Sequence, residues 1–109
     1  MAHPLITIKK RSSFVYVRDN GNFIRSNSFN IQILEDNKLG NQIFVGYTAT
    51  KRLGNATIRN KSKRRMRELA KKVITKYGKI NFYYVLIAKS LLLKKTFSEI
   101  ELELKKILI

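Results

Sequence analysis

Several residue types are absent or rare in this chain, and each absence excludes a class of function. The 109 residues contain no cysteine, which excludes disulfide scaffolds, thiol catalysis and cysteine-ligated metal centres. The single histidine is His3, beside the N-terminus, so neither a Ser-His-Asp triad nor a histidine-rich metal site is expected. Two common routes to protein-based catalysis are therefore closed from the outset.

Long hydrophobic runs are missing as well. No stretch approaches the roughly 20 apolar residues of a membrane span, and the N-terminus lacks the apolar segment of a signal peptide. We therefore expect a cytoplasmic protein that makes no membrane contact. Hydrophobic residues still make up 44% of the chain, which is enough for the packed core of a single domain spanning residues 1–109.

Acidic residues are scarce. Seven Asp and Glu face 23 Lys and Arg, which leaves a formal net charge of +16 and predicts a polyanionic partner, most plausibly a nucleic acid. Phosphodiester hydrolysis by a protein usually needs clustered carboxylates or a histidine base, whereas the acidic residues here are scattered along the chain. We therefore predict no catalytic residue, no metal site and no firmly bound cofactor.

Hydrophobic periodicity predicts a mixed α/β chain. Helices are expected near residues 12–20, 56–77 and 97–109, and strands near 29–34, 42–50 and 81–88. Ser12 or Ser13 is the expected cap of the first helix, and Asn55 that of the long helix. The order Thr96, then Glu99, predicts a capping box for the last helix. Gly21 and Gly78 are the expected ends of the first two helices.

These elements predict an α+β two-layer sandwich. Its small, mostly antiparallel sheet would have about four strands, with about three helices over one face, in the order α-β-β-(β)-α-β-α. Strands 29–34 and 42–50 are expected to form an antiparallel hairpin. The strand at 81–88 is apolar on both faces and is placed at the centre of the sheet. Residues 1–11 are predicted to form a flexible basic arm that orders only on a partner.

Positive charge is concentrated in residues 51–72, which contain ten basic residues and one acidic residue. On the predicted helix, Arg59, Lys63 and Arg67 recur every fourth residue and form one ridge, flanked by Asn60 and Arg64. Like charges at this spacing repel one another, so helix stability alone would not favour them, whereas phosphate binding would. The sequence therefore predicts that this ridge binds nucleic acid.

The segment from Val45 to Glu68 resembles the signature of the bacterial ribonuclease P protein subunit. The matching residues are Val45-Gly46, Lys51-Arg52, Gly54-Asn55-Ala56, Arg59-Asn60-Lys61, Lys63-Arg64 and Arg67-Glu68. Lys61 stands where the family carries an arginine, which keeps the charge but loses the two-pronged donor geometry. Weaker matches around Phe14, Val17, Gly21, Phe29 and residues 87–89 extend the resemblance over nearly the whole chain.

The resemblance implies a ribosomal-protein-like fold with a left-handed crossover, and a non-catalytic subunit of an endoribonuclease. Its partners would be the ribonuclease P catalytic RNA and precursor tRNA, with Mg²⁺ required by the RNA-containing holoenzyme. The residues implied to contact the catalytic RNA are Lys51, Arg52, Arg59, Asn60, Lys61, Lys63, Arg64 and Arg67. Those implied to form a cleft for the 5′ leader of precursor tRNA are Phe14, Val17, Arg18, Phe29 and Gln32.

Two other classes remain open on charge alone. A ribosomal-type RNA-binding protein would be equally basic but would not explain the ordered Gly-Asn-Ala to Arg-Asn motif. A DNA-binding protein is disfavoured, since the chain shows no helix-turn-helix and no dimerising element, so no DNA partner is expected.

Overall fold

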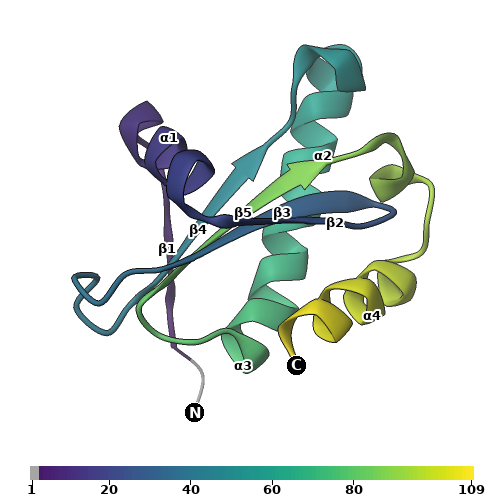
Figure 1. The fold of residues 1–109 in the computed structure, drawn as a ribbon. Helices are drawn as coiled ribbons and strands as arrows, with labels where there is room; N and C mark the ends of the chain where they lie inside the picture. The colour runs from purple at the N-terminus through teal and green to yellow at the C-terminus, as the bar shows by residue number, and fades with distance from the viewer. Residues whose placement is uncertain (1–2) are drawn as a thin grey trace.

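The computed structural model describes residues 3–109 and is built around one five-stranded sheet (Figure 1). In chain order the elements are β1 (Leu5–Thr7), α1 (Arg11–Asn20), β2 (Asn22–Arg25), β3 (Phe29–Glu35), β4 (Ile43–Thr48), α2 (Ala56–Leu69), α3 (Thr75–Tyr77), β5 (Phe82–Ala88) and α4 (Phe97–Leu108). Short 3-10 turns at Lys51–Leu53 and Ser90–Leu93 precede α2 and α4. The α+β class and the element order after β1 are those that the sequence predicts.

The sheet has the strand order β1-β4-β5-β3-β2. The pairs β1–β4 and β4–β5 are parallel, and β5–β3 and β3–β2 are antiparallel, so the sheet is evenly mixed and has five strands instead of about four. The predicted hairpin between residues 29–34 and 42–50 is wrong, because β5 lies between β3 and β4. Placing the doubly apolar β5 at the centre buries both of its faces, as the sequence predicts, and leaves the short β1 and β2 at the edges.

The segment expected to be a flexible arm contains β1. Leu5 pairs with Ile43 and Thr7 with Val45, and the next residue, Ile8, is buried. The arm prediction is therefore wrong for residues 5–8, because Leu5–Thr7 adds a parallel strand to the free edge of β4 and Ile8 packs against Val17 of α1. Residues 1 and 2 of the predicted arm lie outside the described residues.

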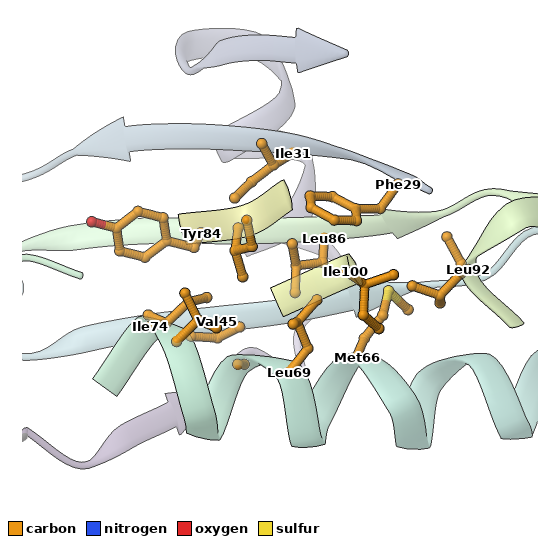
Figure 2. Packing of buried hydrophobic residues seen from close by; sticks show 14 of the residues in the cluster. Phe29, Ile31, Val45, Met66, Leu69, Ile74, Tyr84, Leu86, Leu92 and Ile100 are labelled. Carbon is orange, nitrogen blue, oxygen red and sulfur yellow. The ribbon is translucent and has the colours of Figure 1, made fainter. Parts of the chain in front are cut away.

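The main core fills the space between one face of the sheet and the helices α2 and α4. Figure 2 shows Phe29 and Ile31 of β3 and Leu86 of β5 meeting Met66 and Leu69 of α2. Hydrophobic periodicity along α2 places Ile58, Met66 and Leu69 on one side of the helix; Met66 and Leu69 are fully buried there, and Ile58 is 37% exposed near the start of the helix.

The helix continues past α2 through a π-helical stretch, Ala70–Ile74, into α3 and ends at Gly78 as predicted. Ile74 is fully buried, although a regular 3.6-residue period would place it to one side of Met66 and Leu69, because the wider π turn changes the direction of the side chains in this stretch.

The opposite face of the sheet carries α1. Val17 of this helix is fully buried against Val85 and Ile8, and Phe14 packs beside them. The helices therefore do not all cover one face, which corrects the predicted layering. Neither Ser12 nor Ser13 caps α1, because the helix begins one residue before them, at Arg11, and its cap position is Lys10. The handedness of the β4–α2–β5 crossover stays a prediction.

Candidate nucleic-acid interface

The predicted basic ridge lies on the outward side of α2. Asn60, Arg64 and Arg67 are exposed, while Arg59 and Lys63 are half-buried. Lys61 is exposed on the other flank of α2, and Lys51 and Arg52 are exposed on the 3-10 turn before α2. The ion pairs within residues 3–109 are Arg18–Asp19 and Lys95–Glu103, so these cations are not neutralised by intramolecular salt bridges.

The turn that leads into α2 explains the Gly-Asn pair of the motif. Gly54 has φ +154°, and a Cβ at this position would lie 2.8 Å from Cδ1 of Ile58, so a side chain there would be strained and crowded. Asn55 caps the helix as predicted, because its Oδ1 accepts a hydrogen bond from the Ile58 N–H at 3.0 Å. Arg59 also closes this turn by donating from Nη1 to the Gly54 carbonyl oxygen at 2.9 Å. One arginine of the motif therefore helps to shape the turn as well as adding charge.

Arg67 is positioned by an aromatic ring on the sheet. Its guanidinium carbon lies 5.6 Å from the ring centroid of Tyr47 on β4, a cation–π geometry. Burial raises the pKa of Tyr47 to about 12, and the positive charge of Arg67 opposes that rise. The phenol is therefore neutral at physiological pH. The contact orients the Arg67 guanidinium without cancelling its charge.

The other flank of α2 is partly structural. Arg65 donates from Nη2 to the Lys95 carbonyl oxygen at 2.7 Å, and its guanidinium carbon lies 6.0 Å from the ring centroid of Phe97. It therefore ties α2 to the start of α4. The charge on this side is thus divided between packing and solvent.

A second feature, an open cavity of about 360 Å³, lies on the opposite face of the sheet between α1 and the strands. Its lining residues are Arg11, Phe14, Val15, Arg18, Gln32, Thr48, Thr50, Val85 and Ile87. Arg11 and Arg18 of α1 bring positive charge to its wall, although Arg18 is paired with the exposed Asp19 at 3.1 Å. Strands β3, β4 and β5 supply a largely apolar floor that includes the Gln32 amide. Thr50 leads directly into Lys51, so the cavity rim continues along the chain into the basic turn before α2.

The cavity contains three of the five residues predicted to form a cleft, namely Phe14, Arg18 and Gln32. Phe14 is half-buried, and its ring edge lies so close to Gly46 that a Cβ there would be 2.5 Å from Cε1 of Phe14. It therefore belongs both to the cavity wall and to the packing beneath it. The closeness also explains why a glycine is needed at position 46.

The other two predicted cleft residues, Val17 and Phe29, are fully buried. Val17 faces the sheet from α1, and Phe29 lies in the main core on the far face of the sheet. Their placement in the cleft is wrong, because an apolar residue on an amphipathic element has the same sequence pattern whether it lines a cavity or fills a core.

Sequence reasoning missed the remaining cavity residues. Arg11 and Arg18 are seven residues apart, so they share one face of α1 with Phe14, and this spacing was a usable signal. Val85 and Ile87 are on one face of β5 by strand alternation. The predicted layering, with helices over one face only, leaves the other face of the sheet open; the structure places α1 on that face and leaves the cavity beside it.

Residues 3–109 contain neither a cluster of metal-ligating side chains nor a membrane-spanning helix. Across residues 3–109, no group of three or more His, Cys, Asp or Glu side chains is placed to hold a metal ion. In the same range, every helix is too short or too polar to cross a membrane.

Comparison with known proteins places these features in a family. The Ribonuclease P family profile matches residues 4–109. The ribonuclease P protein component of Brucella suis is 31% identical over 109 residues, covering 94% of this chain and 77% of the relative. This chain belongs to the ribonuclease P protein component family.

Two further similarities agree with this assignment. The ribonuclease P protein component of Ruegeria pomeroyi is 47% identical over a shorter match of 47 residues, which covers 43% of this chain and 38% of that relative. The solved structure of the Staphylococcus aureus RNase P protein superposes with a TM-score of 0.75 at 28% identity, covering 94% of this chain and 91% of that one.

Family membership confirms the predicted identity and fold class. As a ribonuclease P protein component, the chain is part of an endoribonuclease of tRNA 5′ maturation, and the family implies an RNA partner in a ribonucleoprotein. Neither a ribosomal-type protein nor a DNA-binding protein is favoured.

Proposed function

We propose that this ribonuclease P component binds the catalytic RNA with the α2 ridge and holds the 5′ leader of precursor tRNA in the α1 cavity, while the RNA performs the cleavage. The observation that supports the proposal most directly is the spatial separation of two basic surfaces. The ridge and the cavity lie on opposite faces of one sheet and are joined through residues 48–52 at its edge. One small protein can therefore contact two RNAs at the same time.

The proposed contribution of the protein is electrostatic and positional. Two RNA strands brought together repel through their phosphates, and a net charge of +16 between them reduces that repulsion. Arginines such as Arg64 and Arg67 offer paired donors to phosphate oxygens, whereas Asn60 can both donate and accept. The leader is unpaired, and a groove with cations above an apolar floor fits such a strand.

The chemistry is assigned to the RNA. Within residues 3–109 the carboxylates do not converge on a site, and His3 is exposed at the end of the chain. We propose that the protein binds no cofactor of its own, that Mg²⁺ serves the RNA-containing holoenzyme, and that the complex works in the cytoplasm on precursor tRNA without DNA or membrane contacts.

Reconstitution tests the proposal. Purified protein is combined with its cognate catalytic RNA and a precursor tRNA, and the cleavage rate is measured while Mg²⁺ is lowered. We expect the protein alone to be inactive, and the protein with RNA to cleave at Mg²⁺ concentrations where the RNA alone is slow. Precursors with the leader shortened stepwise should gain less from the protein. A catalytic RNA that gains nothing from the protein would overturn the assignment.

A further inference from the structure

Phe23 on the edge strand β2 is a large apolar side chain without a packing partner that covers it. It is 50% exposed. Its neighbour Ile24 packs against the main core, together with Ile33 of β3. Because successive side chains of a strand point to opposite faces, Phe23 lies on the α1 face, the face that holds the cavity.

The strand register places Phe23 in line with the cavity floor. Phe23 pairs with Gln32 of β3, and Gln32 pairs in turn with Val85 of β5. Gln32 and Val85 both line the cavity. Directly paired residues have Cβ atoms about 5 Å apart, so Phe23 lies one strand beyond the cavity and on the same surface.

The next set of paired residues on the same face of the sheet is mostly polar and basic. Arg25 pairs with Asn30, and Asn30 pairs with Ile87, another cavity residue. Arg25 is exposed, and Arg11 and Arg18 occupy the wall across the cavity. An aromatic ring beside arginines and an amide is thus continuous with a positively charged groove.

This combination fits unpaired RNA better than a protein partner. Bases stack on aromatic rings whatever their sequence, and arginines bind the phosphates between them. The cores of protein–protein contacts are instead depleted of charge, whereas here the exposed ring lies on the same face as Arg25 and as the cavity lined by Arg11 and Arg18. Within the cavity lining itself the aromatic ring is Phe14, which is half-buried and packed on Gly46.

We propose that Phe23 is a base-stacking residue, which binds one unpaired nucleotide of an RNA strand that leaves the cavity across β3 and β2. The inference rests on the proposed function, since the strand in question is the leader of precursor tRNA. It adds a residue outside the predicted cleft and a direction for the strand, from α1 toward the β2 edge of the sheet.

A fluorescent variant tests the contact directly. The chain contains no tryptophan, so Phe23→Trp introduces a single one into the holoenzyme reconstituted with its cognate catalytic RNA. Adding precursor tRNA should change its emission saturably, and mature tRNA without a leader should not. Leu102→Trp is the matched control, because Leu102 is similarly exposed, at 51%, and lies on α4, away from the cavity. Equal responses from both variants, or no response at Phe23→Trp, would overturn the proposal.

Affinity measurements test the energetic role. Phe23→Ala should weaken binding of precursor tRNA by the holoenzyme about 5-fold or more, in line with the loss of one stacked base. Phe23→Tyr keeps a ring and should restore binding, and Leu102→Ala should leave it unchanged. Leaders carrying one abasic nucleotide at a time should reveal a single position at which Phe23→Ala has no further effect.

The possible outcomes distinguish a failure of the stacking role from a failure of the proposed function. If wild-type protein stimulates the catalytic RNA but Phe23→Ala binds precursor tRNA normally, the stacking role is wrong and the proposed function stands. If Phe23→Ala weakens precursor and mature tRNA equally, the stacking role is also wrong, because the leader is then not the ligand. If wild-type protein does not stimulate the catalytic RNA, the proposed function itself fails.

Discussion

Glu103 shows how a single side chain ties the layers of this fold together. It lies on α4, and its carboxylate accepts hydrogen bonds from the Ser28 backbone N–H and from Ser28 Oγ, both at 2.8 Å, and from Ser26 Oγ. Burial by itself would raise the pKa of Glu103, but these hydrogen bonds and the nearby Lys95 outweigh it and hold the pKa below the ordinary value of 4.5. One carboxylate therefore fastens α4 to the turn between β2 and β3.

We expect Glu103→Gln to lower the free energy of unfolding at pH 7 by about 1–3 kcal/mol, the usual cost of disrupting a buried hydrogen-bonded group. A depressed pKa contributes stability above pH 4.5 that is lost as the pH falls through the folded-state value. The wild-type protein should therefore lose stability in acid more steeply than the variant. Urea denaturation at several pH values measures both effects.

Glu101→Gln is the control for this prediction, since it makes the same charge change on the same helix. Glu101 lines a different groove, beside Tyr77 and Lys105. If Glu101→Gln and Glu103→Gln have the same effect on stability and on its pH dependence, the hydrogen-bonded contact to the turn is not the cause.

At the scale of the element, α2 serves the core and the surface with different sides. Met66 and Leu69 are fully buried under the sheet, while the ridge carries cations that repel one another by a few tenths of a kcal/mol per pair. Packing and the Asn55 cap must therefore stabilise a helix that its own charges destabilise. The helix tolerates its charge pattern because its buried side stabilises it through packing, while its basic side is left available to bind RNA.

The ridge leads to a prediction about salt. Arg67→Ala should weaken binding to the catalytic RNA and reduce the slope of log affinity against log salt concentration by about 1, as expected for one lost phosphate contact. Lys106→Ala removes the same charge from an exposed position on α4 and should have a smaller effect on both quantities. Filter-binding titrations over a range of salt concentrations measure them. Equal effects would mean that the charge acts diffusely and that the ridge is not a specific surface.

At the scale of the molecule, the net charge of +16 destabilises the free protein but favours the complex with RNA. Self-repulsion destabilises a compact cation, and salt screens it over about 10 Å at 0.1 M and about 3 Å at 1 M. RNA relieves the same repulsion by binding, but salt weakens that binding. Salt should therefore act in opposite directions on the free protein and on the complex.

We expect the melting temperature of the free protein to rise with sodium chloride between about 0.01 and 1 M, because screening reduces self-repulsion. Over the same range, the extra thermal stability conferred by bound catalytic RNA should shrink, because the bound fraction falls. Differential scanning fluorimetry with and without RNA measures both trends. A free protein whose melting temperature falls over this range would contradict the prediction.

Local patterns in the sequence were sufficient for several features of the fold and site. The Asn55 cap, the end of the long helix at Gly78 and the Thr96–Glu99 capping box are formed by neighbouring residues, and all three predictions are confirmed. Strand alternation by itself puts Gln32 and Phe29 on opposite faces of β3, and the structure has Phe29 in the main core and Gln32 in the cavity lining. The basic ridge of α2 can also be predicted from the sequence, because helical spacing alone brings Arg59, Lys63 and Arg67 to one side of the helix.

Other features depend on contacts between distant segments. The predicted hairpin failed because β5, far along the chain, gains burial on both faces by inserting between β3 and β4. The burial of Val17 and Phe29, and the partial exposure of Phe14, followed only once α1 and α2 were placed on opposite faces of the sheet.

By itself, then, the sequence determined the type of each main element, which side of it is apolar, the concentration of cations on one helix and the family motif. The tertiary structure decided which strands are neighbours, that residues 5–7 form a strand, which aromatic residues stay accessible, and that Phe23 extends the row begun by Gln32 and Val85. The physical reason is the separation along the chain of the residues that interact. Periodicity and capping are set by residues within a few positions of one another, whereas pairing and burial are decided by competition among segments across the whole chain.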